Sequence, residues 1–364
     1  MTNPTDQFLF VACQRGAERA LKHELARDWK DFRFAYSQPG FVTFKLPPNH
    51  GLPGDFDLHS VFARTYGFSL GGIQGDTAEQ LAQQFWSLVG ENTFRHLHVW
   101  QRDAAMVGDH GFEPGITMLA SEVGEWILRR RPHQDRPLQL NQTARSGERV
   151  LDCILIEPGN WWIGWHTAAA IPSRWPGGIP PIEKPADAIS RAYLKMAEAL
   201  AWSQLPVHAG DACVEIGSSP GGSCQALLDR ELVVTGIDPA EMDEQILAHS
   251  NFTHVRARGA DLRRRDFSSF RWLFADSNVA PQHTLDTVEH IVTNDRVSVR
   301  GMILTLKLIK WDLAEQLPEY IQRVRSWGYQ YVKARQLAFN RQEVCVVALR
   351  RRSMRREPVW KRRK

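Results

Sequence analysis

The pattern of hydrophobic and polar positions becomes regular after about residue 190. From there on, short apolar runs recur, and most of them are separated by segments whose apolar residues have helical spacing. The runs are Ala212–Ile216, Val233–Ile237, Trp272–Ala275, Met302–Leu306 and Val344–Leu349. This alternation predicts an α/β domain over residues 189–349, built as a doubly wound, mostly parallel sheet with helices on both faces.

The first 73 residues show a different pattern. Phe8–Ala12 is an apolar run, and Ala17, Leu21 and Leu25 recur at helical spacing after it. Phe41–Leu46 then alternates like a strand after the turn pair Pro39-Gly40. The order strand, helix, strand predicts a small α+β domain over residues 1–73.

A second N-terminal module is predicted over residues 75–168. Its expected helices are 78–89 and 117–130, and its expected strands are 94–102, 150–156 and 161–166. Residues 169–188 then contain five prolines and the pair Gly177-Gly178, which predicts a connector rather than regular structure. Neither stretch contains a cluster of residues that indicates catalysis.

Composition is that of an ordinary globular protein, with 43% hydrophobic and 24% charged residues. No apolar run of about 18 residues occurs, and the first residues lack the basic-then-apolar pattern of a signal peptide. The five cysteines, Cys13, Cys153, Cys213, Cys224 and Cys345, are far apart and form no CxxC pair. We therefore expect no membrane span, no disulfide framework, no metal site and a cytoplasmic location.

Charge is concentrated at the C-terminal end. Residues 350–364 contain nine basic residues and one acidic residue, a net charge of +8, whereas the other 349 residues carry a net charge of −4. A basic tail on a nearly neutral body is typical of a protein with a polyanionic partner. A solvated tail without a partner fits the composition equally well.

The most specific local signal follows the first apolar run of the α/β domain. Glu215-Ile-Gly-Ser-Ser-Pro-Gly-Gly222 lies between this predicted strand and a predicted helix. Glycines at such a turn let the backbone approach a ligand closely. The spacing differs from the G-x-G-x-x-G pattern of dinucleotide sites, so a pyrophosphate is not the favoured ligand.

Two acidic residues follow the loop at positions that suit a nucleoside ligand. Asp238 ends the next predicted strand, and a carboxylate there accepts hydrogen bonds from ribose hydroxyls. Asp261 precedes the third apolar run, where it can face an adenine amine. Taken singly, each acid is better explained as a cap or turn residue, but with the glycine loop they favour an adenosyl cofactor.

The loop and its following acid resemble those of FtsJ-type methyltransferases, which bind S-adenosylmethionine and carry a Lys-Asp-Lys-Glu tetrad. The matching residues here are Lys195 in Ser190-Arg-Ala-Tyr-Leu-Lys195, Asp276 after the third run, Lys307 at the end of the fourth and Glu343 before the fifth. The resemblance implies these four residues as catalytic. It implies S-adenosyl-L-methionine as the cofactor, with Ser190, Glu215, Gly217, Ser219, Pro220, Gly221, Gly222, Asp238, Asp261 and Asp276 in its site.

A wider resemblance covers most of the chain. The segments Cys13–Gly16, Glu157–Gly159, Pro185–Arg191 and Arg335–Leu337 are similar to those of the bacterial RlmM family. That family joins a ferredoxin-like region and a THUMP domain to an FtsJ-type domain, and methylates a cytidine 2′-hydroxyl in the peptidyl-transferase region of 23S rRNA. The resemblance therefore implies large-subunit ribosomal RNA as the partner. Two departures are Ser219, where the family usually has cysteine, and Asp238-Pro-Ala-Glu in place of Asp-Asn.

The chemistry of such a reaction explains the residue types of the tetrad. A ribose hydroxyl needs a base to take its proton as it attacks the sulfonium methyl. Lys307 is the expected base, and a nearby Lys195 would favour its neutral form, whereas Asp276 and Glu343 would act in the opposite direction and orient the lysines. The alternative is a pair of buried salt bridges without catalysis.

Two other functions remain compatible with the sequence. A ribosome-assembly factor that binds cofactor and RNA without turnover would have the same fold, but would not need Lys307. A methyltransferase acting on tRNA or on a small molecule would have the same tetrad. The N-terminal modules and the basic tail disfavour a small substrate but do not separate ribosomal from transfer RNA.

Overall fold

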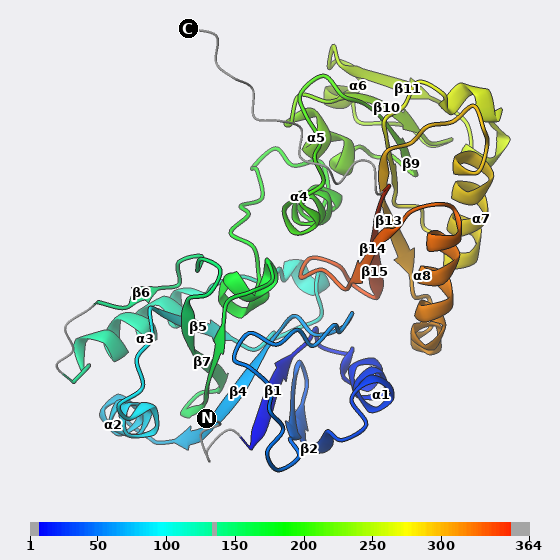
Figure 1. Cartoon of the computed structure of the whole chain (residues 1–364). Helices are drawn as coiled ribbons and strands as arrows, with labels where there is room; N and C mark the ends of the chain where they lie inside the picture. Colours follow the sequence, from blue (N-terminus) through cyan, green and yellow to red (C-terminus); the bar gives the residue numbers. More distant parts are fainter. Residues whose placement is uncertain (1–6, 133–136, 351–364) are drawn as a thin grey trace, which may run out of the picture. The chain divides into compact units, whose positions relative to one another are not determined.

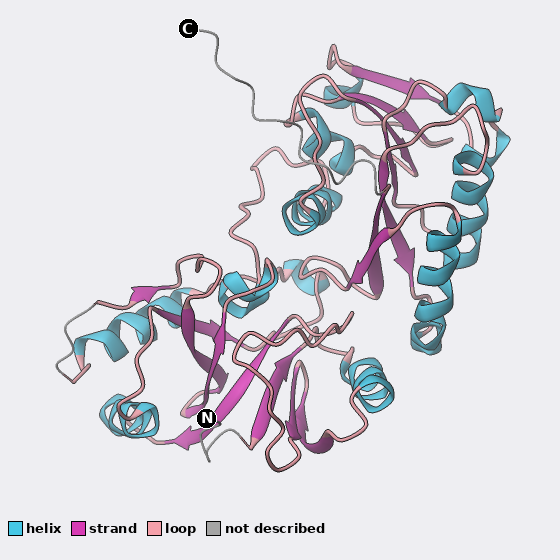
Figure 2. Cartoon of the chain, in the orientation of Figure 1, coloured by secondary structure: helices cyan, strands magenta, loops and turns pink. Residues whose placement is uncertain are grey.

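The computed structural model describes residues 7–132 and 137–350, and it forms two compact units, Met1–Pro181 and Ile182–Lys364. Each unit is built on one β-sheet with helices packed against it (Figure 1, Figure 2). The predicted basic tail lies outside the described residues, apart from Arg350. Along the described parts of the chain, no helix has the length and apolar character needed to cross a membrane.

The first unit contains an eight-stranded sheet in the order β2-β3-β1-β4-β8-β7-β5-β6. Its strands are β1 (Phe8–Ala12), β2 (Arg33–Gln38), β3 (Phe41–Lys45), β4 (Thr65–Gln74), β5 (His96–Gln101), β6 (Gln139–Leu140), β7 (Arg149–Glu157) and β8 (Asn160–Thr167). Its helices are α1 (Glu18–Asp28), α2 (Ala78–Val89) and α3 (Met118–Arg129). Because β4 pairs with β1 on one side and β8 on the other, the two predicted N-terminal modules share one continuous sheet.

The helices of this unit begin where the sequence provides a cap. The hydroxyls of Thr77 and Thr117 accept hydrogen bonds from Gln80 N and Ala120 N at the starts of α2 and α3. Both helices contribute to one apolar cluster with β5 and β7, on the face that carries Leu97. A second apolar cluster, which includes Trp100 and Phe10, lies on the opposite face of the sheet.

The part of the proline-rich connector before Ile182 belongs to the first unit and packs on it. It forms two 3₁₀ turns, Pro172–Arg174 and Pro176–Gly178. Gly177 lies so close to Trp100 that an added Cβ would be 3.1 Å from the indole ring. The carbonyl of Gly177 also accepts a hydrogen bond from Arg64, whose guanidinium forms a buried ion pair with Asp103. The prolines therefore mark a packed segment and not a free linker.

The second unit contains a seven-stranded sheet in the order β11-β10-β9-β12-β13-β15-β14. Its strands are β9 (Ala212–Ile216), β10 (Val233–Ile237), β11 (Phe252–Val255), β12 (Trp272–Ala275), β13 (Gly301–Lys307), β14 (Tyr331–Arg335) and β15 (Glu343–Leu349). Its helices are α4 (Ala192–Ser203), α5 (Gly222–Leu228), α6 (Glu244–Leu247), α7 (Pro281–Val292) and α8 (Leu317–Ser326). Only the pairings of β15 are antiparallel, and Figure 2 shows helices on both sides of the sheet, which confirms the predicted doubly wound fold.

The connectivity of this sheet places a ligand site at one edge. The chain runs from β9 outward to β10 and β11, and then returns to β12 on the other side of β9. In such sheets, ligands bind beyond the carboxyl ends of the strands where the order reverses. The glycine loop follows β9, Asp238 follows β10 and Asp276 follows β12, so the predicted site residues meet at this reversal point.

Candidate active site

The loop after β9 approaches the neighbouring strand ends closely. Gly217 has a φ of +81°, and a Cβ added there would lie 2.8 Å from the carbonyl oxygen of Asp276. Its amide donates to Ile237 O, and the amide of Asp276 donates to Ile216 O. The turn therefore requires glycine, both for its left-handed backbone and for the contact.

The second part of the loop is attached to the segment after β10. Ser219 N donates to Asp238 Oδ2 at 3.2 Å, and Ser219 Oγ donates to Glu241 O at 2.7 Å. Pro220 O accepts a hydrogen bond from Asp243 N at 2.9 Å. The serine that replaces the family's cysteine thus holds the loop against the segment that also differs from the family.

The start of α5 packs against the segment that leads into α4. A Cβ on Gly222 would lie 2.2 Å from Ser190 Oγ, so only glycine fits. Gly221, with a φ of +124°, is equally crowded, because its Cβ would lie 2.8 Å from Ile246. Gly221 and Gly222 are therefore required by close contacts within the protein at the start of the helix.

Glu215 lies on β9 below this loop and is fully buried. The thiol of Cys224 donates a hydrogen bond to its Oε2 at 2.9 Å. Burial raises the pKa of Glu215 to about 7, which the hydrogen bonds from Cys224 and Ser223 oppose. Glu215 therefore supports the loop from beneath as a carboxyl group that holds its proton more strongly than an exposed glutamate.

Asp261 is placed differently from the other predicted cofactor residues. It is exposed at the end of a 3₁₀ turn, Gly259–Asp261, that follows β11. The turn is close to β9, since a Cβ on Gly259 would lie 2.9 Å from Ile216. The structure thus brings the turn of Asp261 to the strand end, and an adenine contact by its side chain stays a prediction.

The four tetrad residues come from four different elements of the second unit. Lys195 lies on α4, Asp276 follows β12, Lys307 ends β13 and Glu343 begins β15. Lys307 and Glu343 are direct partners in the antiparallel pairing of β13 with β15. The register of the sheet therefore sets the position of one lysine–glutamate pair, and α4 brings the second lysine to it.

The four side chains form a closed ring of alternating charges. Lys195 Nζ lies 2.5 Å from Asp276 Oδ2 and 3.2 Å from Glu343 Oε1. Lys307 Nζ lies 2.7 Å from Asp276 Oδ1, and it also forms an ion pair with Glu343 Oε2. All four side chains are at most 18% exposed, so little solvent screens these contacts.

Electrostatics fix the charge of three members of the ring. Burial acts to raise the pKa of Asp276 and of Glu343, but the neighbouring ammonium groups outweigh it and hold both values below the ordinary range. Burial acts to lower the pKa of Lys195, and the two carboxylates reverse this effect and raise it. At neutral pH, Asp276 and Glu343 are therefore carboxylates and Lys195 is an ammonium.

Two supporting residues were not predicted from the sequence. Glu198, fully buried on α4, accepts hydrogen bonds from Ala338 N at 2.8 Å and Phe339 N at 2.9 Å. Asn340 donates through Nδ2 to Glu343 Oε1 at 3.2 Å. Glu198 lies three residues after Lys195, so one face of α4 holds both the first lysine and the turn that leads to Glu343. Glu198 could have been found from the sequence, because it is an acidic residue inside the apolar stretch of a predicted helix.

The backbone cradle at the strand ends fits the adenosyl cofactor that the sequence predicts. Gly217, Gly221 and Gly222 let the loop pack closely against its protein neighbours, with no side chains of their own, and Asp238 is half-buried next to them. Among the described residues, no group of three or more His, Cys, Asp or Glu side chains is arranged to hold a metal ion. The ring of lysines and carboxylates lies next to the loop, since the backbone of Asp276 lies against Gly217.

Comparison with known proteins agrees with this geometry. The family model for FtsJ-like methyltransferases matches residues 188–342. The ribosomal RNA large subunit methyltransferase M of Halorhodospira halophila is 28% identical, with 94% of this chain and 97% of the relative covered. The protein of the same name from Thauera aminoaromatica is also 28% identical, but the match covers 56% of this chain and 57% of that relative. The predicted resemblance to these methyltransferases is thereby confirmed.

Similarity to solved structures is weaker. The fibrillarin pre-rRNA processing protein of Methanococcus jannaschii matches at 14% identity with a TM-score of 0.36, covering 47% of this chain and 86% of that chain. Similarity at this level supports no conclusion about function. The functional argument therefore depends on the site and on the sequence relatives.

Proposed function

We propose that this chain, which resembles the ribosomal RNA large subunit methyltransferase M proteins along nearly its whole length, is an S-adenosylmethionine-dependent 2′-O-ribose methyltransferase of 23S rRNA. The observation that carries the proposal is the ring of Lys195, Asp276, Lys307 and Glu343 beside the glycine loop. As the resemblance implies, we expect the target to be a cytidine near the peptidyl-transferase centre. We therefore expect the protein to act in the cytoplasm, where it would meet this RNA.

The residues that would hold the cofactor surround the reversal point of the sheet. The backbone from Gly217 to Gly222 would approach the amino-acid part, Asp238 would accept from the ribose hydroxyls, and Asp261 would face the adenine. S-adenosylmethionine, when bound there, supplies the methyl group as a sulfonium. Asp276 lies where the cofactor loop meets the tetrad and would contribute to both.

The protein's own part in the reaction is to position a ribose and move its proton. Lys307 would take the proton of the 2′-hydroxyl as the oxygen attacks the methyl carbon in line. A lysine accepts a proton only when it is neutral, so Lys307 must be deprotonated in the reactive complex. Asp276 and Glu343 would orient the two lysines, and Lys195, whose pKa the carboxylates raise, would balance their charge as an ammonium.

The first unit would dock the RNA. In line with the resemblance, we assign its first part to a ferredoxin-like domain and residues 75–168 to a THUMP-like RNA-binding domain. Structured RNA is recognised mainly through backbone and shape, while the nucleotide whose ribose reacts must be splayed out of its stack to enter the active site. The first unit would therefore supply affinity, and the second unit would receive one exposed nucleotide.

Ribose-methylation mapping of total RNA tests this proposal. RNA from cells that contain the protein should carry one large-subunit ribose methyl group that is missing without it, and the purified protein should restore it. If the purified protein restored a methyl group on tRNA alone, its substrate would be a transfer RNA and not the ribosomal RNA. No methyl transfer to either RNA, with cofactor and RNA both bound, would indicate an assembly factor without turnover.

A further inference from the structure

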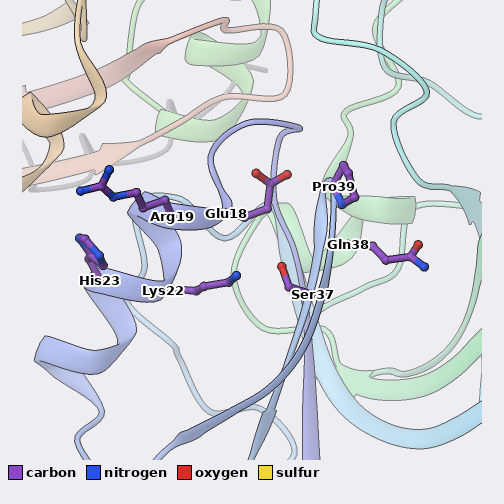
Figure 3. Close-up of a pocket in the computed structure, with 7 residues that line it drawn as sticks. All are labelled: Glu18, Arg19, Lys22, His23, Ser37, Gln38 and Pro39. Atoms are coloured by element: carbon purple, nitrogen blue, oxygen red, sulfur yellow. The ribbon is translucent and has the colours of Figure 1, made fainter.

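A second polar site lies in the first unit, at the open edge of its sheet. A pocket of about 410 Å³ is formed between α1 and the end of β2 (Figure 3). Its lining residues are Glu18, Arg19, Lys22, His23, Ser37, Gln38 and Pro39. None of them takes part in the tetrad or the cofactor loop.

Donors gather on the helical side of this pocket. Arg19, Lys22 and His23 have the spacing i, i+3 and i+4, so they share one face of α1. Figure 3 shows the Lys22 side chain extending from α1 toward the strand that carries Ser37. The pocket is therefore lined by a guanidinium, an ammonium, an imidazole and a hydroxyl, together with the Glu18 carboxylate.

The acidic residues of α1 are all engaged by groups of this chain, although Glu18 also lines the pocket. Glu18 accepts hydrogen bonds from Gly16 N at 3.0 Å and from Gly40 N, so its carboxylate holds two backbone segments. Glu24 is 5% exposed and accepts from the amides of Val61 and Phe62. Asp28, the third acidic residue of α1, pairs with Arg27 at 2.7 Å. All three carboxylates thus have partners within the chain.

An exposed aromatic ring adjoins the basic residues. Lys22 Nζ lies 4.5 Å from the centre of the Phe34 ring, and Phe34 is 55% exposed on the edge strand β2. Basic groups interleaved with an exposed ring are typical of surfaces that bind nucleic acid.

We propose that the pocket between α1 and β2 binds a backbone phosphate of the RNA substrate, with the ring of Phe34 stacking on a neighbouring base. The proposal builds on the function given above, because it assigns part of the RNA-docking surface of the same enzyme. Arg19 and Lys22 supply charge-assisted hydrogen bonds, which are the strong ones for a phosphate. Stacking on Phe34 is independent of base sequence, since every base has a π-face.

Equilibrium binding of the full-length protein to large-subunit rRNA at several salt concentrations tests the proposal. Lys22→Ala should weaken binding about tenfold, the loss expected for one charge-assisted hydrogen bond. The slope of log affinity against log salt should fall by about 0.7–0.9 per lost phosphate contact. The control is Lys30→Ala, which removes an exposed lysine outside the pocket and should change neither quantity.

Phe34→Leu separates stacking from charge. It should weaken binding about 5- to 150-fold, the loss expected for one base–aromatic stack, without changing the salt slope. The Michaelis constant for RNA should rise in both variants while kcat stays unchanged, since neither residue touches the reacting ribose. Thermal unfolding of each variant checks that the fold is intact.

The outcomes distinguish this proposal from the proposed function. Wild-type protein that binds the RNA without methylating it would contradict the enzymatic function alone, and the variants would still report on the pocket. Efficient methyl transfer, with the affinity and salt slope of Lys22→Ala equal to those of Lys30→Ala, would contradict the pocket alone. Equal behaviour of Lys22→Ala and Lys30→Ala would also indicate that the pocket binds an acidic protein segment instead of RNA. Absence of RNA binding by the wild type would contradict both.

Discussion

Lys307 and Glu343 are register partners on two antiparallel strands, and their side chains form an ion pair. Side chains alternate between the two faces of a sheet, so a slip of one residue would move Glu343 to the opposite face. Asn340 and Glu198 hold the turn that precedes Glu343. The position of the expected base therefore depends on strand pairing and on a buried turn together.

Cofactor binding should depend on the close contact at Gly217. Gly217→Ala places a Cβ 2.8 Å from Asp276 O, so the loop must shift, and affinity for S-adenosylmethionine should fall about tenfold or more, above 1.4 kcal/mol. Gly210→Ala is the matched control, because Gly210 has a φ of +80° but nothing within 4 Å of its Cβ position. Titration calorimetry with S-adenosylmethionine and S-adenosylhomocysteine measures both. Equal cofactor affinities of Gly217→Ala and Gly210→Ala would show that the loop is not part of the cofactor site.

Glu198 should act as a positioning residue. Glu198→Gln replaces one of the two acceptor oxygens with a donor, which faces a backbone amide and pushes the turn before Glu343 away. Misplacement by about 1 Å costs on the order of a hundredfold in rate, so kcat should fall by about tenfold to a hundredfold. Glu319→Gln, an exposed change on α8, should have no effect.

A merely structural role for Glu198 would give a different result. It would lower the free energy of unfolding by about 1–3 kcal/mol and leave kcat of the folded protein unchanged. Rapid-quench measurement of kcat, with the affinities for cofactor and RNA measured alongside, separates the two. The positioning role requires a lower kcat with both affinities within a few-fold of the wild type.

Glu215 should make the free energy of unfolding depend on pH, in the range between its pKa in the unfolded chain and its pKa in the folded protein. The folded pKa of about 7 lies above the ordinary value of 4.5, so the folded chain binds more protons in this window and loses stability as pH rises through it. The effect is about 3 kcal/mol at about 1.36 kcal/mol per pKa unit. Glu215→Gln lacks this titration, while other groups titrate equally in both proteins.

Urea unfolding at several pH values measures this difference. The free energy of unfolding of wild type minus that of Glu215→Gln should decrease between pH 4.5 and pH 7. A difference that does not change with pH would show that Glu215 titrates in the folded protein as it does when unfolded.

The sequence predicted the central strands and missed the edges. β11 and β14 end the sheet of the second unit on either side, and β2 and β6 end that of the first. An edge strand is paired and covered on fewer sides, so it carries few apolar residues; β2, for example, is exposed at its first four positions. β4 is central and was missed for another reason. Its glycines interrupt the pattern, and Gly67 is required because a Cβ there would lie 2.5 Å from Trp165 O.

The candidate site was also predictable from the sequence only in part. The tetrad residues lie at strand ends and on one helix, so the pattern of strands together with the family resemblance was enough to find them. Salt bridges among these four residues were foreseen as the alternative to catalysis. Their closure into one ring, in which each lysine contacts both carboxylates, was not predictable, because it depends on side-chain reach across three strands and α4. The pocket beside α1 was not predictable either, since basic residues three and four positions apart are common on exposed helices.

The role of Lys307 as the base is tested most directly by single-turnover methylation of large-subunit rRNA with Lys307→Arg protein. Arginine keeps the positive charge between Asp276 and Glu343 but cannot accept a proton. The account predicts a rate loss of about 10²–10⁴-fold, close to that of Lys307→Ala, with cofactor binding nearly unchanged. A folded Lys307→Arg protein that works within a few-fold of the wild type would contradict it, and would leave the ring as a structural set of salt bridges.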